Sequence, residues 1–153
     1  MKHLAFILSA FLLSACGFSP VYSSAANSSS IIVDDIPGRS GHELRKSLIR
    51  ELAAGLPDVD SARLNVDLDE DLRRLSFRPD EAAARTDIQA EGRYVLVVGE
   101  TTVSGKVSTE TSYNVPDAPY GDIAAQTDAS KRAMRKLASA IVDDIRLKLA
   151  TDQ

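Results

Sequence analysis

The residue best suited to chemistry is Cys16, because it is the only cysteine among 153 residues and follows a short apolar run. Lys2 gives the chain a positive start, residues 4–13 are almost entirely apolar, and Ala15 is a small residue directly before the thiol. This order is typical of a secretory signal peptide. Ten residues in a helix span about 15 Å, half of the hydrocarbon core of a bilayer, so the segment is too short for a transmembrane anchor.

The segment Leu13-Ser14-Ala15-Cys16 resembles the lipobox of bacterial lipoproteins. The resemblance implies that a diacylglyceryl group is attached to the Cys16 thiol, that residues 1–15 are removed by cleavage between Ala15 and Cys16, and that the new amino terminus is acylated. Several acyl chains, at about 0.8 kcal/mol per buried CH₂, make such an attachment effectively permanent. Gly17 stands where inner-membrane lipoproteins commonly have Asp, which favours the outer membrane. The alternative is an ordinary signal peptide with an incidental cysteine.

Composition and charge predict one domain on a tether. Residues 16–30 form the lipidated amino terminus and a flexible tether, since residues 23–30 are nearly all Ser, Ala and Asn. Residues 31–153 form a single domain. After cleavage the chain has 17 basic and 22 acidic residues, a net charge of −5, because Lys2 is the only charged residue removed. That charge and the absence of tryptophan argue against nucleic-acid binding.

Hydrophobic periodicity predicts the element order β-α-β-β-β-α. A strand at residues 31–33 precedes a helix that starts with the capping-box pair Ser40 and Glu43 and stops at Gly55. The helix carries an apolar stripe: Leu44, Leu48, Ile49, Leu52 and Leu56. A second helix, at residues 120–149, has a similar stripe: Ala133, Met134, Leu137, Ile141, Ile145 and Leu149.

Three long strands are predicted between the helices. The first alternates from Ala62 to Leu72 and shifts phase near Arg73-Arg74, which indicates a bulge. The second and third strands are joined by a turn at Gly99. In the second, polar residues at odd positions are expected to face solvent: Arg85, Asp87, Gln89, Glu91 and Arg93. The expected fold is an α+β two-layer sandwich, in which two helices cover one face of a mostly antiparallel four-stranded sheet and the other face stays open.

No catalytic or metal-binding motif in the sequence is complete. His42 is the only histidine after cleavage, and no nucleophile-elbow pattern surrounds a serine, so it is interpreted as a solvated helix residue. Residues 67–71 imitate a calcium loop, yet Leu72 occupies the place of the required glycine and Arg78 that of the required glutamate. Zinc would need several Cys or His ligands. We therefore expect no enzyme, metal or cofactor, although a carboxylate pair for glycoside hydrolysis stays open.

Basic residues supply the remaining candidate site. Arg73, Arg74 and Arg78 stand together at the end of the irregular strand, and Arg93 and Lys106 are expected on the open side of the sheet. Guanidinium groups suit bidentate recognition of phosphate. The alternative is a solvated face that is balanced by the acids of residues 69–71.

Over nearly its whole length the sequence resembles LptE, the lipoprotein family of the lipopolysaccharide-assembly machinery, and most closely its alphaproteobacterial members. The resemblance rests on residues 16–22 (CGFSPVY), on 36–41 (IPGRSG) leading into Leu44-Arg45, on Ala84-Arg85, on 112–115 (SYNV) and on the alanine-rich start of the last helix.

The resemblance implies a non-enzymatic protein at the periplasmic face of the outer membrane. Family members lie as a plug in the lumen of the LptD β-barrel, assist its assembly and bind lipopolysaccharide for delivery to the outer leaflet. We expect the three arginines to contact lipopolysaccharide. Two alternatives remain, an auxiliary lipoprotein of an inner-membrane transporter and a tethered hydrolase.

Overall fold

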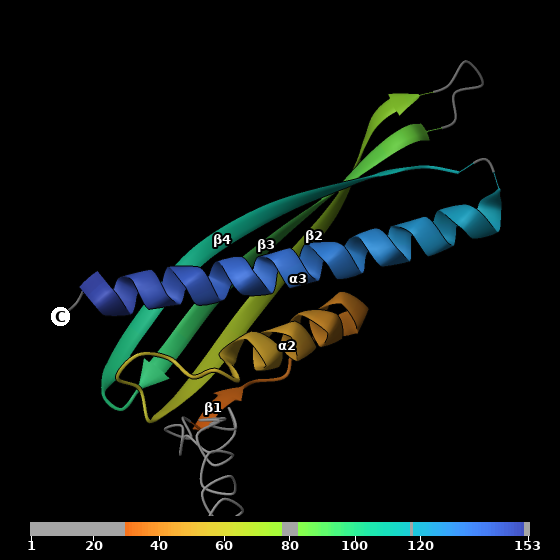
Figure 1. The fold of residues 1–153 in the computed structure, drawn as a ribbon. Coiled ribbons are helices and arrows are strands. Elements are labelled where there is room, and N and C mark those ends of the chain that lie inside the picture. The colour runs from red at the N-terminus through yellow and green to blue at the C-terminus, as the bar shows by residue number, and fades with distance from the viewer. Residues whose placement is uncertain (1–29, 78–82, 117, 152–153) are drawn as a thin grey trace, which may run out of the picture.

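The computed structural model describes residues 30–77, 83–116 and 118–151. In chain order its elements are β1 (Ser30–Val33), α2 (Gly38–Leu52), β2 (Ser61–Phe77), β3 (Ala83–Val98), β4 (Thr101–Asn114) and α3 (Pro119–Thr151). Figure 1 shows both helices on one face of a single sheet, with α3 running along nearly its whole length. The predicted order and the α+β two-layer architecture are confirmed.

The four strands lie in the sheet in the order in which they occur in the chain. β1 pairs with β2 in parallel, with Ser30 opposite Ser61, and both other pairings are antiparallel. The turn between β3 and β4 contains only two residues, because Val98 pairs with Thr101. Gly99 in this turn has φ = 58°, a left-handed conformation that glycine adopts without a steric penalty. The turn predicted at Gly99 is therefore confirmed.

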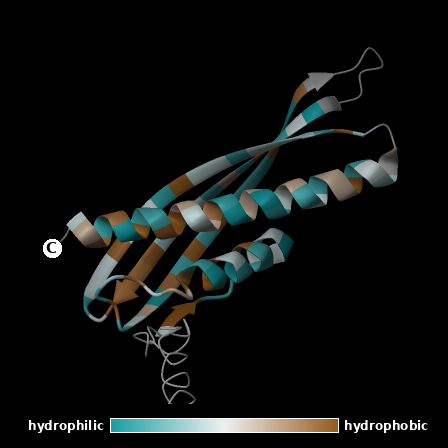
Figure 2. Cartoon of the chain, in the orientation of Figure 1, coloured by the Kyte–Doolittle hydropathy of each residue, from teal (hydrophilic) through white to brown (hydrophobic). Residues whose placement is uncertain are grey.

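The core lies between the sheet and the helices. On the strands the buried apolar residues occur at alternate positions and include Leu64, Val66, Ile88, Tyr94 and Leu96. Figure 2 shows hydrophobic, brown segments among hydrophilic, teal ones along the strands. On α3 the predicted stripe is confirmed: Ala133, Met134, Leu137, Ile141 and Ile145 are completely buried, and Leu149 is partly buried. Each large aliphatic side chain in this stripe contributes about 1.5–3 kcal/mol by its burial. Within the described ranges, no helix combines the length and apolar character required to cross a bilayer.

The start of α2 differs from the prediction. The helix begins at Gly38, its N-cap is Pro37, and no side chain caps it. Ser40 lies inside the first turn, where its hydroxyl donates a 2.5 Å hydrogen bond to Glu70 Oε2 on β2. The predicted capping box is therefore wrong, because the Ser40 hydroxyl group bonds to the Glu70 carboxylate of β2 and does not cap the helix.

The apolar stripe of α2 is only partly as predicted. Leu44, Leu48 and Leu52 are buried, but Ile49 is 46% exposed. Ser47 is buried instead, because the buried face is centred on Leu44 and Leu48 and the helical rotation carries position 49 out of it. The predicted stop is confirmed, since the helix ends at Leu52 and Gly55 follows with φ = 79°.

The predicted irregularity of β2 lies close to its expected place. The pairing with β3 shifts register between Arg74 and Ser76 and again between Ser76 and Phe77. The shift therefore begins directly after Arg73-Arg74. Up to Arg74 successive side chains of β2 point alternately to the two faces of the sheet. Arg73 and Arg74 therefore point to opposite faces.

Candidate functional site

Several residues predicted to form the functional site lie outside the described residues. These are Ala15 and Cys16, the expected cleavage and lipid-attachment residues, and Arg78. The tether expected over residues 16–30 also falls there, except for Ser30, which starts β1. Lipid attachment at Cys16 stays a prediction.

Arg73 and Arg74 do not form the joint cluster that their adjacency suggested. Arg73 lies on the open face, where its Nε donates a 3.2 Å hydrogen bond to Asp71 Oδ2. Arg74 points to the helix side, because it pairs with Thr86 of β3, which is buried on that side of the sheet. Successive residues of a strand point to opposite faces, so the two guanidinium groups cannot meet one ligand from the same side of the sheet. Their contact with lipopolysaccharide stays a prediction.

The open face of the sheet carries a ladder of paired charges. Arg93 on β3 contacts Asp67 of β2 at 3.3 Å and Glu91 of its own strand at 2.9 Å, and Lys106 of β4 contacts Glu91 at 2.9 Å. The hydrogen bond from Lys106, with that from Arg93, lowers the pKa of Glu91 below its usual 4.5. The expected placement of Arg93 and Lys106 on the open side is confirmed, and the charges there largely neutralise one another.

Beside this ladder the open face is hollowed by a cleft of about 550 Å³. Its lining is mainly polar and comes from β2, β3 and β4: Asp69, Glu70, Asp71, Arg73, Gln89, Ala90, Glu91, Ser108, Thr109 and Glu110. The segment 67–71, which imitates a calcium loop, is here an extended strand. In the described part of the chain, no group of acidic or imidazole side chains could hold a metal ion. The cleft offers hydrogen-bonding groups to a polar surface.

Asp87 is an exception on this face. It was predicted to face solvent, yet its side chain is only 7% exposed. The closest cationic atom is Arg85 Nε, 3.9 Å from Asp87 Oδ1, and that oxygen has no hydrogen-bond partner among the described residues. Register places Arg73 of β2 and Ser112 of β4 on either side of it. Strand alternation predicts the face a residue occupies but not how far its neighbours cover it.

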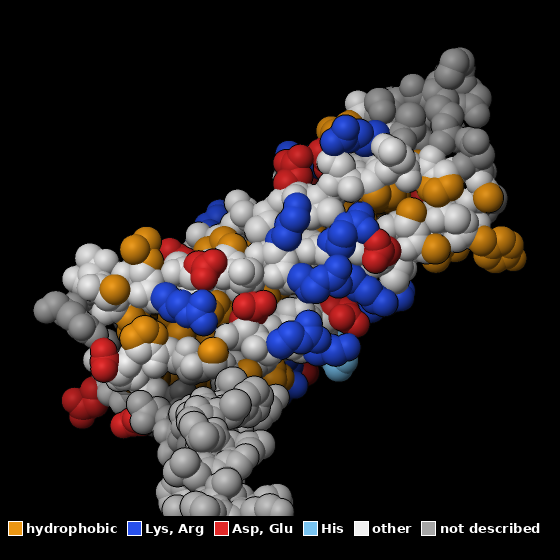
Figure 3. All heavy atoms as spheres, in the orientation of Figure 1, with side chains coloured by type: hydrophobic (Ala, Val, Ile, Leu, Met, Phe, Trp, Pro, Cys, Tyr) orange, Lys and Arg blue, Asp and Glu red, His pale blue; other side chains and the backbone are white. Residues whose placement is uncertain are grey.

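The helix layer carries a second charged surface, which is not among the sites predicted from the sequence. Basic side chains gather over the middle of α3 and the adjoining part of α2, as the space-filling view in Figure 3 shows. Four of the six residues 131–136 are basic. This basic run could have indicated the surface from the sequence. The basic residues of α2 come next to it only because α2 packs beside α3. His42, on α2, is exposed as predicted.

Comparison with solved structures gives the class of protein that has this fold. A scan of family models and a search of curated proteins found no match. A candidate lipoprotein from Caulobacter crescentus is 27% identical, with a TM-score of 0.63, and the match covers 83% of this chain and 95% of that one. A minor lipoprotein from Acinetobacter baumannii matches at TM-score 0.57 and 11% identity, over 79% of this chain and 94% of that one.

A third match is lipoprotein B from Nitrosomonas europaea, with a TM-score of 0.55 and 11% identity over 79% of this chain and 84% of that one. The chain thus has the α+β fold of these lipoprotein structures. Its similarity to the Caulobacter crescentus protein, which is the highest in sequence identity of the three, extends over most of both chains.

Proposed function

We propose that this chain is an outer-membrane lipoprotein of the LptE type, anchored through Cys16. It lies as a plug in the LptD β-barrel, assists the assembly of that barrel and binds lipopolysaccharide for delivery to the outer leaflet. The role is that of a binding partner and not of an enzyme.

The observation that carries the proposal is the uncovered, polar face of the sheet. Both helices cover the other face, while the charge ladder of Asp67, Glu91, Arg93 and Lys106 leaves this one polar without a large net charge. The lumen of a large transmembrane β-barrel is polar, so a plug must offer hydrogen-bonding groups to it. A face of this kind suits a barrel wall better than a lipid environment.

Shape and similarity support the same assignment. A 33-residue helix is about 50 Å long and lies along the sheet, so the domain is elongated enough to follow the inside of a barrel. The three lipoprotein structures share this fold, and the signal segment ends in a lipobox-like sequence.

Crosslinking from the open face tests the proposal. A photo-crosslinking amino acid at Gln89 or Ser108, both in the lining of the cleft, should give a covalent product with LptD in intact cells. The same probe at Glu51, on α2 of the opposite layer, is the control and should give little of that product. A product with an inner-membrane transporter component would favour the alternative function, and the absence of any barrel product would refute the proposed docking.

A further inference from the structure

Positive charge is concentrated on the helix layer. Residues 39–51 and 128–136 together contain eight basic and three acidic residues, a surplus of five positive charges in a chain whose net charge is −4. The two segments lie next to each other, because the hydroxyl groups of Ser40 on α2 and Ser130 on α3 are 3.1 Å apart. These two adjoining helix segments of an acidic protein are therefore strongly basic.

Three of these eight cations have a partner within the fold. Arg45 Nε donates to the Val33 carbonyl, Arg132 pairs with Asp128 one turn earlier, and Lys136 Nζ donates to the Glu110 carbonyl. The side chains of the other five make no ion pair or hydrogen bond among residues 30–77, 83–116 and 118–151. We call these five the helix-layer patch: Arg39, Lys46, Arg50, Lys131 and Arg135.

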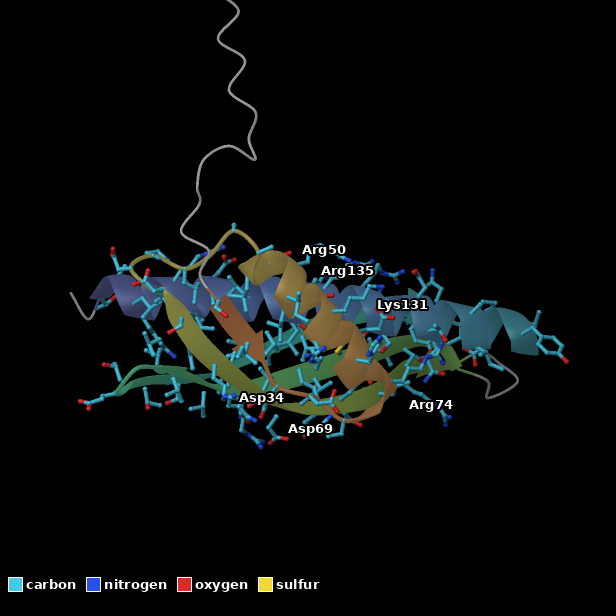
Figure 4. All side chains as sticks on the ribbon, turned by 90° about the horizontal axis from the view of Figure 1, so that it is seen from below. Asp34, Arg50, Asp69, Arg74, Lys131 and Arg135 are labelled. Carbon is cyan, nitrogen blue, oxygen red and sulfur yellow. The ribbon has the colours of Figure 1, made fainter. Side chains whose placement is uncertain are left out.

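The spacing of the like charges in the patch is unfavourable for the stability of the two helices. Lys46 and Arg50 on α2, and Lys131 and Arg135 on α3, are four residues apart and so project from the same side of their helices. Like charges at this spacing destabilise a helix by about 0.2–0.5 kcal/mol per pair. In Figure 4 the labelled Arg50, Lys131 and Arg135 lie on the helix side, opposite the labelled acids of the sheet side. A bound anion would convert this repulsion into attraction.

We infer that the helix-layer patch binds the phosphate groups of lipopolysaccharide, an inference that rests on the proposed function. Five cations spread over two adjacent helices match a ligand with several separated phosphates better than a single small anion. Three of the five are arginines, whose planar guanidinium groups bind phosphate in a bidentate manner. By contrast, Arg73 and Arg93 on the open face already pair with acids. The two acids of α2, Glu43 and Glu51, reduce the positive field without cancelling it.

The test compares two variants with the same change in net charge. In the detergent-solubilised mature lipoprotein, Lys46, Arg50, Lys131 and Arg135 are replaced together by Gln, and the control replaces Arg63, Arg85, Arg93 and Lys106, all on the open face of the sheet, by Gln. Binding of purified lipopolysaccharide is measured at low and high salt. The helix-layer variant should bind about tenfold more weakly, which corresponds to roughly 1.4 kcal/mol for the loss of three exposed cations and the half-buried Lys131. Its affinity should also depend less on salt.

Each other outcome has a definite meaning. Equal binding by the wild type and the helix-layer variant, both folded by circular dichroism, overturns the inference and leaves the proposed function intact. An equal loss of affinity in both variants also overturns it, because the change in net charge would then be sufficient to explain the loss, wherever the cations lie. If dephosphorylated lipopolysaccharide binds as well, or if phosphatidylglycerol vesicles compete equally, the ligand assignment is wrong. Failure of the wild type to bind lipopolysaccharide removes that part of the proposed function itself.

Discussion

The hydroxyl group of Tyr94, on β3, donates a 2.5 Å hydrogen bond to Asp144 Oδ2 on α3, across the interface between the sheet and the long helix. Lys148 Nζ lies 2.9 Å from the same carboxylate oxygen and donates to the Tyr94 oxygen at 3.2 Å and to the Ser104 carbonyl of β4 at 2.8 Å. This cluster connects β3, β4 and α3 at one end of the molecule. It holds the long helix in register on the sheet whose other face we propose as the docking surface.

Removal of the Tyr94 hydroxyl should destabilise the fold. Tyr94→Phe keeps the buried ring but deletes a hydrogen bond to a charged group, so we expect a loss of about 1.5–3 kcal/mol in the free energy of unfolding. Urea denaturation should show a lower midpoint with an unchanged slope. The control is Tyr120→Phe, because Tyr120 is 88% exposed, and it should leave the midpoint where it is. Equal midpoints for Tyr94→Phe and the wild type would refute the structural role of the cluster.

Gly105 should not tolerate a methyl group. A Cβ atom there would lie 2.6 Å from both Asp144 Oδ2 and the Tyr94 hydroxyl oxygen, and also against Lys148 Nζ. Gly105→Ala must therefore push the cluster apart, at a cost of about 1–3 kcal/mol. Gly92→Ala is the comparison, since its Cβ would meet mainly the flexible end of Ile141, 2.9 Å away. Thermal unfolding should lower the melting temperature more for Gly105→Ala, and the reverse order would contradict this account.

The same cluster predicts how stability depends on pH. Hydrogen bonds from Tyr94 and Lys148 hold the pKa of Asp144 below its usual 3.8, so this carboxylate stabilises the fold above that pH and loses its effect as pH falls towards its folded pKa. The bond to Asp144 raises the pKa of Lys148 above 10.5, and burial raises that of Tyr94 above 10.0. Their contributions are complete below those values and are lost as pH rises through the raised ones.

The measurement for this prediction is the free energy of unfolding of wild type and of Asp144→Asn between pH 2 and pH 7. The difference between them should be constant near neutral pH and should shrink below about pH 3.8, where protonation of Asp144 makes the wild type resemble the variant. A difference that persists unchanged down to pH 2 would show that the carboxylate does not act through its charge.

The hydroxyl group of Ser40 should act through β2 and not as a helix cap. Glu70 accepts hydrogen bonds from Ser40 at 2.5 Å and from Ser130 at 2.6 Å, and so connects β2 to both helices. Ser40→Ala and Glu70→Gln should therefore show a coupling energy of about 0.5–3 kcal/mol in a double-mutant cycle. A parallel cycle of Ser40→Ala with Glu43→Gln, the partner predicted by the capping-box spacing, should show almost none. Coupling to Glu43 in place of Glu70 would restore the capping box.

These cases show which features the sequence could predict. The buried stripe from Ala133 to Ile145 could be predicted, because the periodicity of apolar residues over many helical turns leaves only one face for the core. The capping box at Ser40 was not reliable, since a three-residue spacing is a weak local signal and cannot reveal a carboxylate 30 residues further along the chain. The placement of Arg73 and Arg74 on opposite faces also follows from the sequence, because strand alternation separates adjacent side chains.

The helix-layer patch shows a different limit. Periodicity places Lys131 and Arg135 on one side of α3, but the position of Lys46 and Arg50 beside them depends on how the two helices pack. The burial of Asp87 is likewise a consequence of the neighbouring strands. Sequence patterns give the orientation of such residues, whereas their surroundings arise only in the folded protein.

The central claim, that this chain is the partner of an outer-membrane barrel, is tested most directly by affinity purification of the native protein from detergent-extracted outer membranes. A plug docked in the barrel lumen through its open sheet face should bury more than the roughly 2,000 Å² that marks obligate interfaces, and such a complex survives extraction. We predict recovery of LptD in a one-to-one ratio, and reduced amounts of assembled barrel when this chain is depleted. Recovery of the protein alone or with an inner-membrane transporter, with barrel levels unaffected by depletion, would contradict the proposed function.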